Sequence, residues 1–401
     1  MKVYFESYGC TLNKSESGLY VNKLLSEGNT LVRRPEEADI SVIGTCVVIK
    51  STEDRMTKRI GELSRESRVR VIGCISSVTG KVLEDENIEV LAPKDFRSFY
   101  TGQLDDIEIK EPSIFDGIPI NQGCTGSCNY CISHVARGKL VSRPIGKIVS
   151  QIRMQLERGI REVRISSLDT AAYGKDIGTS LPDLVEAISS SEGDFMLRVG
   201  MMEPRNTLSV KDRLMESYSS GKVFKFMHLP VQSGDNRVLE SMNREYSRED
   251  FEEIVSAFRN AYPDSMLSTD IIAGYHGDDE ESFEKTVSLI EKTRPEIINI
   301  TRFSPRPYTP DYNVKTPPSN DTKRWTKEYA RIHEEITRDK FSKETGKVKT
   351  VLVNEKGKNG TVVGRDLAYR PVVIPGDFPV YSKVECEIVD SDRIYLVGKK
   401  I

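Results

Sequence analysis

The chain lacks the features of secreted, membrane-spanning and strongly basic nucleic-acid-binding proteins. No apolar run among its 401 residues approaches the roughly 20 residues that a membrane-spanning helix needs. The segment Met1 to Cys10 has no apolar core of the kind found in a secretory signal. A net charge of -3 gives no overall attraction to nucleic acid. We therefore expect a cytoplasmic protein without membrane contact, in which any contact with RNA is local.

Histidine and cysteine are both scarce, which narrows the choice of metal chemistry. The four His show no paired ligand spacing such as H-E-x-x-H, so we assign none of them a catalytic task. Seven Cys in a chain expected to be cytosolic favour metal or redox chemistry over a disulfide framework. They divide into an early group of Cys10, Cys46 and Cys74, a central group of Cys124, Cys128 and Cys131, and Cys386, which we expect in a protein core.

The central cysteines form a C-x3-C-x2-C motif within Asn121–Cys131. A cubane iron–sulfur cluster normally takes four thiolates, and no fourth Cys lies nearby, so one iron is left to bind a substrate or cofactor. The alternative is a zinc site, which usually closes with four N or S ligands. His134 is the nearest spare ligand, and a second C-x2-C pair is missing. The motif, with Tyr130 before its last Cys, resembles the signature of radical S-adenosylmethionine enzymes.

Residues 1–110 alternate between apolar strands and helices, which predicts a doubly wound parallel sheet of the α/β class. We expect strands at 3–8, 39–45 and 69–73 and helices at 15–26, 52–64 and 77–83. Cys10, Cys46 and Cys74 each follow a strand, and such strand ends converge on the ligand crevice of an open parallel sheet. We hypothesise a second cluster with these three ligands. The alternative, plain core packing, suits one or two of them.

Residues 111–340 alternate in the same way, and six strands with intervening helices predict a partial (βα)6 barrel. The expected strands lie at 118–120, 162–167, 195–200, 225–229, 268–272 and 297–301, with a helix at 145–158. Chemistry in such barrels sits at the carboxyl ends of the strands. We expect Asp235 to be a structural residue at a helix start, and Asp278 to Lys292 to be the exposed face of a helix.

Polar or glycine-rich segments follow several of these strands and are candidate contacts for S-adenosylmethionine. Ser167 or Asp169 would hold the methionyl amine, Gln232 would meet the ribose, and Ile272 would offer an apolar face to adenine, with Tyr130 beside the cluster. Each segment taken singly is as readily a loop or a helix cap. Because these segments all lie at strand ends, we favour the cofactor-binding role for them as a group.

Residues 341–401 are rich in short strands with Gly and Pro turns, which predicts a small β-barrel. This segment carries 11 Lys or Arg against 8 Asp or Glu, a net +3, so the rest of the chain is net -6. Arg365, Tyr369 and Arg370 place cations beside an aromatic ring, which suits phosphate contact and base stacking in RNA binding. A solvated turn is the equal alternative for this trio.

The three segments in this order resemble the methylthiotransferase family, and the last resembles a TRAM domain. Four segments are most similar to the archaeal and eukaryotic branch of that family: Asn121–Pro144, Met201–Met202, His228–Tyr246 and Asp270–Gly277. The resemblance implies an enzyme that adds a methylthio group to carbon 2 of N6-threonylcarbamoyladenosine beside the tRNA anticodon. It also implies two 4Fe-4S clusters and S-adenosyl-L-methionine as cofactors.

The resemblance further implies a mechanism in two stages. Sulfur held at the cluster of the early cysteines receives a methyl group, and the catalytic cluster of Cys124, Cys128 and Cys131 gives rise to a radical that abstracts hydrogen from the adenine. The implied partners are tRNA, an electron donor protein and a sulfur donor. A methylthiotransferase acting on a ribosomal protein and a non-catalytic iron–sulfur electron carrier remain as alternatives.

Two segments depart from the pattern of this branch. Tyr275-His276-Gly277-Asp278 stands where Phe-Pro-Gly-Glu is common, which leaves details of cofactor packing open. Arg306-Pro307-Tyr308-Thr309 stands where Arg-Pro-Gly-Thr is common, which leaves details of a substrate loop open. Neither departure changes a cluster cysteine.

Overall fold

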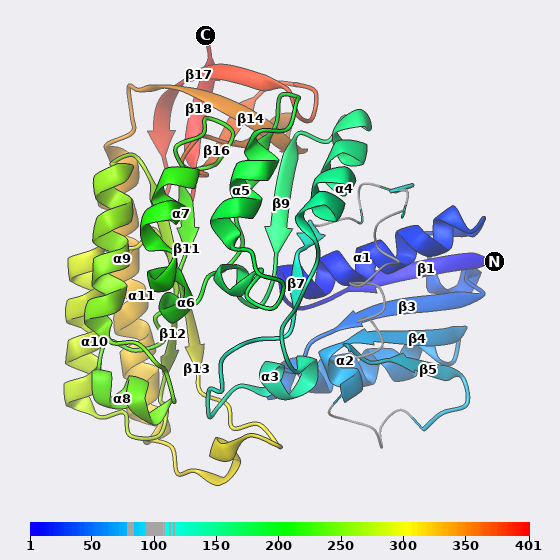
Figure 1. Cartoon of the computed structure of the whole chain (residues 1–401), viewed down its shortest axis with the longest axis horizontal. Helices are drawn as coiled ribbons and strands as arrows, with labels where there is room; N and C mark the ends of the chain where they lie inside the picture. The colour runs from blue at the N-terminus through cyan, green and yellow to red at the C-terminus, as the bar shows by residue number, and fades with distance from the viewer. Residues whose placement is uncertain (78–83, 94–106, 108, 112–113, 115–116) are drawn as a thin grey trace. The chain divides into compact units, whose positions relative to one another are not determined.

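The computed structural model describes residues 1–77, 84–93, 107, 109–111, 114 and 117–401 (Figure 1). The chain forms two compact units, each built from several stretches: Met1–Arg158, Val163–Ser191 and Ser304–Val314 in the first, and Gly159–Glu162, Glu192–Phe303 and Lys315–Ile401 in the second. No helix in these described ranges is long and apolar enough to cross a bilayer. Domain boundaries at residues 110 and 340 stay predictions from the sequence.

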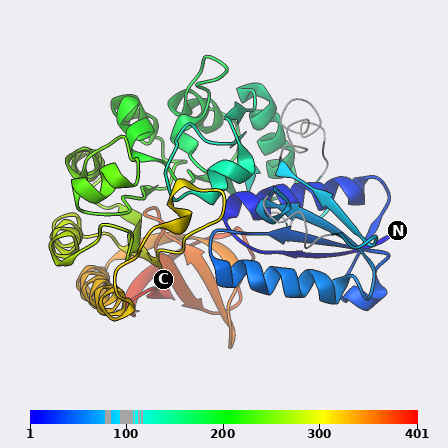
Figure 2. The same cartoon turned by 90° about the horizontal axis from the view of Figure 1, so that it is seen from below.

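The first unit begins with a five-stranded parallel sheet in the order β2-β1-β3-β4-β5. Its strands are β1 (Lys2–Ser7), β2 (Thr30–Val32), β3 (Ile40–Thr45), β4 (Arg68–Gly73) and β5 (Ile88–Leu91). All six residues of the central strand β3 are buried, as expected for a strand covered on both faces. Figure 2 shows α1 (Thr11–Ser26) and α2 (Lys50–Leu63) on opposite faces of this sheet. The doubly wound fold expected from the sequence is confirmed.

The sequence did not reveal the two edge strands, β2 and β5, because they are short and partly exposed. After β4 the chain enters a 3-10 turn, Cys74–Ser77. From the sequence, a helix was expected at residues 77–83. Residues 78–83 lie outside the described residues, so that prediction is not tested.

The central cysteines lie in a loop that two short strands close. β7 (Asn121–Gln122) pairs antiparallel with β8 (Val141–Ser142), and α3 (Ile132–Arg137) lies between them in the chain. Ile132 and Ala136 of α3 belong to the same buried cluster as Met56 of α2 and Cys74. The helix that follows the cysteine motif is therefore packed on the N-terminal sheet layer.

The remaining elements of the first unit continue the alternation of strands and helices. Parallel pairing joins β6 (Ile118–Pro119) to β9 (Glu162–Ser166). The elements after β8 are α4 (Ile145–Glu157), the 3-10 turn Thr170–Ala172 after β9, α5 (Leu181–Ser189) and the 3-10 turn Pro310–Asn313. These elements place a polar loop directly after the carboxyl end of β9.

The second unit carries the other barrel strands. β11 (Phe226–His228), β12 (Met266–Ala273) and β13 (Ile297–Arg302) form a parallel sheet in that order. The other elements before the C-terminal barrel are β10 (Met196–Arg198), α6 (Pro204–Ser209), α7 (Lys211–Ser217), α8 (Asn236–Ser241), α9 (Arg248–Ala261), α10 (Glu280–Thr293) and α11 (Ser319–Ser342). All six strands expected between residues 111 and 340 are present, although β10 and β11 have only three residues each.

The C-terminal segment forms a closed five-stranded barrel in the order β14-β15-β16-β18-β17. Its strands are β14 (Val348–Lys356), β15 (Thr361–Arg365), β16 (Pro371–Pro375), β17 (Lys383–Ser391) and β18 (Leu396–Lys400). The last strand was not expected from the sequence. Cys386 is fully buried in the barrel core, as predicted from its alternation with acidic neighbours.

Candidate iron–sulfur centres

The early cysteines all lie at the carboxyl edge of the N-terminal sheet. Cys10 is the N-cap of α1 directly after β1, Cys46 follows β3, and Cys74 begins the turn after β4. The three strands are neighbours in the sheet. The strand order reverses beside β1, and such a switch point opens a crevice for ligands. None of the three cysteines forms a disulfide bond.

Two glycines make the approach of these cysteines possible. Gly9 has a φ of +96°, and a Cβ built on it would lie 2.8 Å from the Cβ of Cys46. Gly73 has a φ of +98°, and its Cβ would lie 2.6 Å from the carbonyl oxygen of Thr45. Any larger residue would collide at both positions, and the left-handed backbone also favours glycine. The sequence pattern Gly-Cys at these strand ends is thus a steric requirement.

The three thiols lie near enough to influence one another's charge. Burial is the main cause that raises the pKa of Cys46 to about 11, and the negative charges of Cys74 and Cys10 raise it further. Cys10 is exposed, yet burial is also the main cause that raises its pKa. The three cysteines thus share one edge of the sheet and lie within electrostatic reach of one another, while the second cluster stays a prediction.

A fully buried arginine of α3 contacts one member of this trio, Cys74. Arg137 donates from Nε to the sulfur of Cys74 at 3.3 Å, from Nη1 to Glu16 at 2.9 Å, and from Nη2 to Asn13. Glu16 and Asn13 are buried on α1. The negative charges of Glu16 and of two thiols raise the pKa of Arg137 against the effect of burial. Arg137, which ends the helix that Cys131 begins, thus connects the two cysteine groups.

The central cysteines gather around a tight turn. The amide of Gly126 donates to the sulfur of Cys124 at 3.2 Å, and a Cβ built on Gly126 would lie 3.5 Å and 3.7 Å from the sulfurs of Cys124 and Cys128. Cys131 donates its amide to the carbonyl of Cys128 and caps α3. Burial raises the pKa of Cys124 to about 12, and the charges of Asp169 and of the other two thiols add to it.

The donor sets fit cubane clusters in number and in kind. Each group offers three free thiols, which leaves one iron of a four-iron cluster for another ligand. Within the described ranges, no three His, Cys, Asp or Glu side chains come close enough to hold a single metal ion. A cubane keeps its thiolates on the outside of a core of several atoms, so its ligands stand farther apart than those of one ion.

In the first unit, the expected cofactor residues after β9 lie near the central cysteines. Asp169 is buried, accepts from the amide of Ala171 at 3.0 Å, and donates its own amide to the hydroxyl of Ser167 at 3.0 Å. Its charge reaches Cys124. Tyr130 is partly buried directly before Cys131. Asp169 is thus both the N-cap of the 3-10 turn Thr170–Ala172 and a neighbour of the cluster loop, so neither expected role excludes the other.

Two buried acceptors before the cluster loop were not singled out from the sequence. Among the described side chains, Oδ1 of Asn121 and Oε1 of Gln122 are buried without a hydrogen-bond donor. Their amide nitrogens are used, since Asn121 donates to the carbonyl of Asp169 at 3.5 Å and Gln122 to that of Pro93 at 2.6 Å. Buried acceptors without donors cost free energy, so these two oxygens are suited to a bound polar ligand.

In the second unit, Gln232 and Ile272 are brought together by the backbone. Gln232 donates its amide to the carbonyl of Asp270 at 2.9 Å, and its own carbonyl accepts from Ile272 at 3.0 Å. Gln232 has a φ of +71° and is buried, a strained conformation that is typical of functional loops.

His228 was assigned no catalytic task from the sequence, yet it joins a polar group on three neighbouring strands. Its Nε2 lies 2.9 Å from Asp270, and Asn299 donates to the same carboxylate oxygen at 2.7 Å. The group is drawn from β11, β12 and β13, so only the parallel sheet brings it together.

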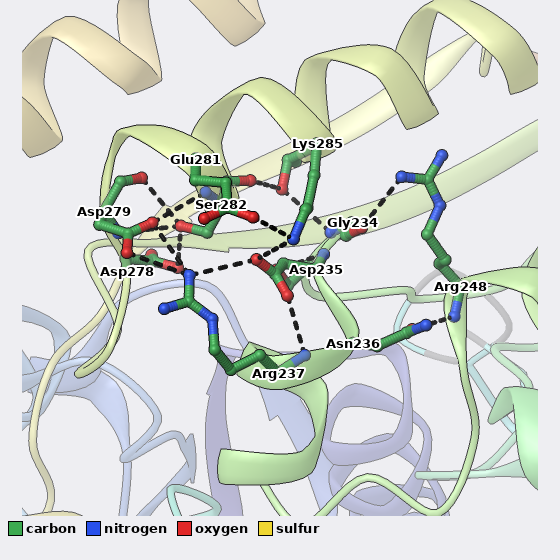
Figure 3. A network of polar contacts seen from close by, with 12 residues as sticks. Gly234, Asp235, Asn236, Arg237, Arg248, Asp278, Asp279, Glu281, Ser282 and Lys285 are labelled. Carbon is green, nitrogen blue, oxygen red and sulfur yellow. Dashed lines mark hydrogen bonds and ion pairs between the residues drawn. The ribbon is translucent and has the colours of Figure 1, made fainter.

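A network of caps holds the loop after β11 and the start of α10 (Figure 3). Asp235 caps α8 by accepting from the amide of Arg237, and it also binds Lys285 at 3.2 Å. Asp279 caps α10 in a capping box with Ser282. The expectation that Asp235 is structural is confirmed, and so is the helix expected within Asp278 to Lys292.

The first departing segment has its own contacts in the second unit. Tyr275 is fully buried and donates its hydroxyl to the carbonyl of Ser241 at 3.0 Å. Asp278 accepts from the amides of Gly274 and Tyr275 at 2.8 Å and 3.0 Å, which closes the turn. Burial raises the pKa of Asp278 to about 6. The residues of this departing segment thus form a turn that is closed by their own hydrogen bonds.

The proposed RNA trio at the C-terminal barrel is largely turned inward. Tyr369 is buried, donates its hydroxyl to Glu162 at 2.7 Å, and its ring lies 4.8 Å from that of Phe224. Arg370 is buried and paired with Asp366 at 2.8 Å and with Asp264.

The expectation that Arg365, Tyr369 and Arg370 together face the solvent is therefore wrong for Tyr369 and Arg370, which are buried. Tyr369 and Arg370 join the barrel to the rest of the second unit, because ring packing and buried ion pairs occupy them. Arg365 alone is partly exposed, with its guanidinium 4.9 Å from the ring of Tyr369.

Comparisons with known proteins agree with this architecture. Residues 2–92 match an uncharacterized protein family, UPF0004, residues 118–290 match the Radical SAM superfamily, and residues 342–401 match the TRAM domain. A Pyrococcus horikoshii protein named "Probable threonylcarbamoyladenosine tRNA methylthiotransferase" is 35% identical, and the alignment covers all of both chains. The chain belongs to the threonylcarbamoyladenosine tRNA methylthiotransferase family.

Other members of the threonylcarbamoyladenosine tRNA methylthiotransferase family come from distant organisms. The Archaeoglobus fulgidus relative is 36% identical over all of this chain and 98% of its own length. The Drosophila melanogaster relative is 31% identical over 99% of this chain and 77% of its own.

Solved structures are similar to this family member in fold alone. The radical S-adenosylmethionine methyltransferase TsrM from Kitasatospora setae has a TM-score of 0.58 at 12% identity, over 78% of this chain and 77% of its own. The radical S-adenosylmethionine fold and the closed C-terminal barrel expected from the sequence are confirmed.

Proposed function

We propose that this chain converts N6-threonylcarbamoyladenosine beside the tRNA anticodon into its 2-methylthio derivative. The family membership supports the substrate and the reaction, since relatives over the full length are named for both. The observation that carries the proposal in this chain is the presence of two separate trios of free cysteines, one at the carboxyl edge of the N-terminal sheet and one within a single short loop. Insertion of sulfur into an unactivated carbon requires both a radical source and a sulfur carrier.

The catalytic trio has a defined task in this scheme. Cys124, Cys128 and Cys131 would hold a 4Fe-4S cluster, which together with bound S-adenosylmethionine would supply the radical chemistry needed at carbon 2 of the adenine. Asp169, fixed by its bonds to Ser167 and Ala171, orients the methionyl amine as a pre-positioned acceptor. Tyr130, Gln232 and Ile272 are assigned to the rest of the cofactor.

Cys10, Cys46 and Cys74 are assigned to a second 4Fe-4S cluster that carries the sulfur to be transferred. Arg137 supports this role because its buried guanidinium offers a hydrogen bond and a positive charge to thiolates that would otherwise repel one another. Asn13 and Glu16 hold the arginine in place.

The expected partners are tRNA, an electron donor protein and a source of sulfur, in the cytoplasm. The TRAM domain is proposed to contact the phosphates of the tRNA, with Arg365 as the residue of the predicted trio that solvent reaches. This electrostatic contact makes binding weaker at higher salt.

Nucleoside mass spectrometry of tRNA from cells that express the chain tests this function. We expect the 2-methylthio derivative with the wild-type chain and none with Cys124→Ala or Cys46→Ala. Cys386→Ala is the matched control, because this cysteine lies outside both trios, and it should retain the modification.

Iron analysis of the same variants after anaerobic reconstitution separates the two sites. Cys46→Ala should retain roughly four of about eight irons per chain. A Cys46→Ala chain with the full iron content would rule out the second cluster. A methylthio group on a ribosomal peptide and none in tRNA would favour that substrate instead. Redox activity without formation of 5'-deoxyadenosine would favour an electron carrier.

A further inference from the structure

The loop at residues 304–314 exposes two aromatic rings. Tyr308 is 69% exposed and Tyr312 is 49% exposed. Among the large hydrophobic side chains exposed in the described part of the chain, these two are the only aromatic ones. Two tyrosines left in water within five residues of each other indicate a binding surface, because the other aromatic rings among the described residues are buried or partly buried.

Tyr308 occupies a backbone position that suits glycine. The amide of Thr309 donates to the carbonyl of Arg306, Pro307 lies between them, and Tyr308 has a φ of +67°. Proline at the second and a positive φ at the third position are the requirements of a type II turn, in which glycine is the usual third residue. A tyrosine is strained there, and residues held in sparsely populated conformations cluster at ligand-binding sites.

Buried contacts hold this loop in place within the first unit. Arg306 forms a buried ion pair with Glu53, at the start of α2. The hydroxyl of Thr309 donates to the carbonyl of Arg306 at 2.6 Å. The amide of Asp311 donates to the carbonyl of Asn129 at 3.2 Å, and Asn129 lies between Cys128 and Cys131. The two rings are thus carried by a fixed turn that is bonded directly to the catalytic cysteine loop.

We propose that Tyr308 and Tyr312 form a stacking site for an unpaired nucleobase of the RNA substrate. Single-stranded loops are recognised by stacking of splayed bases on aromatic side chains, and every base offers a flat face for it. A loop fixed to the cysteine motif would hold a base that neighbours the target adenosine. This inference rests on the proposed function, because it requires an RNA loop at the catalytic cysteines.

A comparison of Tyr308→Phe with Tyr308→Leu tests the stacking. Both variants place a large side chain at the same strained position, and only Phe retains an aromatic face. The probe is an anticodon stem-loop RNA with N6-threonylcarbamoyladenosine beside the anticodon and 2-aminopurine at each other loop position in turn. Binding is measured with the full chain after anaerobic reconstitution of its clusters.

Stacking quenches 2-aminopurine fluorescence, so the wild type and Tyr308→Phe should quench one loop position. Tyr308→Leu should lose that quenching and bind the RNA about tenfold or more weakly. Tyr312→Leu should show the same direction of change. Ile177→Ala removes an exposed apolar side chain elsewhere in the first unit and should change neither reading.

The outcomes separate this inference from the proposed function. Equal affinity and equal quenching for Tyr308→Leu and the wild type would overturn the stacking site while leaving the proposed function intact. Absence of binding to the stem-loop by the wild-type chain would overturn both.

Discussion

The Nε of Arg137 lies 3.3 Å from the sulfur of Cys74 and donates a hydrogen bond to it, although 63 residues separate the two in the chain. Arg137 is fully buried, and its other nitrogens donate to Glu16 and Asn13. A buried arginine without partners would cost several kcal/mol. Here each of the three guanidinium nitrogens has a hydrogen-bond partner. This arrangement also fixes α3 on the N-terminal sheet.

Loss of this arginine should destabilise the protein and alter the early cysteine site. Arg137→Gln leaves Glu16 buried without its counter-charge, so we expect a loss of roughly 3–5 kcal/mol in the free energy of unfolding. Urea unfolding of the anaerobically reconstituted chain measures it. Loss of a hydrogen bond to sulfur should also make the reduction potential of the proposed second cluster, at Cys10, Cys46 and Cys74, more negative.

The partly exposed pair of Arg59 and Glu6 is the control for this change. Arg59→Gln should cost no more than about 1 kcal/mol. A double variant, Arg137→Gln with Glu16→Gln, should recover part of the stability, since the isolated buried charge is then removed. An Arg137→Gln chain with wild-type stability and an unchanged potential would contradict the role given to Arg137.

Asp278 should make the protein less stable as pH rises through 6. Burial raises the pKa of this carboxyl to about 6, above its ordinary value, so the folded chain holds the proton more tightly than the unfolded chain. The cost of ionisation, about 2–3 kcal/mol, is fully present above pH 6 and is relieved as pH falls toward 4. Asp278→Asn should therefore be more stable than the wild type at pH 8 by about that amount, and the difference should vanish near pH 4.

The neighbouring Asp279 provides a control of opposite sign. Bonds to the backbone of Ser282 are the main cause that lowers the pKa of Asp279, so its contribution is favourable at neutral pH and is lost in acid. Asp279→Asn should be less stable than the wild type at pH 8. Thermal unfolding across pH 4–8 measures both variants, and parallel curves for Asp278→Asn and the wild type would refute the first prediction.

Substitutions at the C-terminal barrel should separate structure from RNA binding. Tyr369→Phe removes the hydroxyl that donates to Oε1 of Glu162 in a buried place, so we expect a loss of about 1–2 kcal/mol in stability and unchanged RNA affinity of the folded chain. Arg365→Gln should leave stability unchanged, weaken RNA binding and lower the slope of affinity against salt by about one.

Chemical unfolding and filter binding over a range of salt concentrations measure these two effects. An Arg365→Gln chain with the wild-type salt slope would show that the RNA phosphates lie elsewhere on the protein.

Tyr308→Gly should stabilise the loop while it weakens RNA binding. Glycine adopts a positive φ freely, and relief of the strain should raise stability by roughly 1 kcal/mol. Tyr381, with a φ of +69°, offers the matched substitution Tyr381→Gly, for which we expect a similar gain. A fall in the melting temperature of Tyr308→Gly would show that the tyrosine makes contacts that stabilise the turn.

The sequence was most informative where chemistry and periodicity coincide in a short stretch. The C-x3-C-x2-C spacing and the Gly-Cys pairs at strand ends led directly to the two cysteine groups, because strand ends in a parallel sheet meet at one edge. Short strands such as β2 and β18 were not found, because three to five partly exposed residues carry little alternation.

The sequence could not reveal which polar residues meet. Arg137 and Cys74, or His228 with Asp270 and Asn299, have no local signal, since their partners lie on other elements. Tyr369 and Arg370 looked like an exposed turn, and packing against Phe224 and pairing with Asp264 turned them inward. Burial of an aromatic ring depends on what lies opposite it.

The amino-acid order by itself determined the order of sheet, barrel strands and closing β-barrel, and it determined which six thiols are available as ligands. Those properties depend on local spacing and on the period of each element. The tertiary structure alone decided that a buried arginine joins the two cysteine groups and that two tyrosines remain exposed on a loop bonded to the central cysteine loop. It also decided that Tyr369 and Arg370 of the expected RNA trio are buried and paired with other residues. Those properties depend on contacts between residues far apart in the chain, which no local pattern encodes.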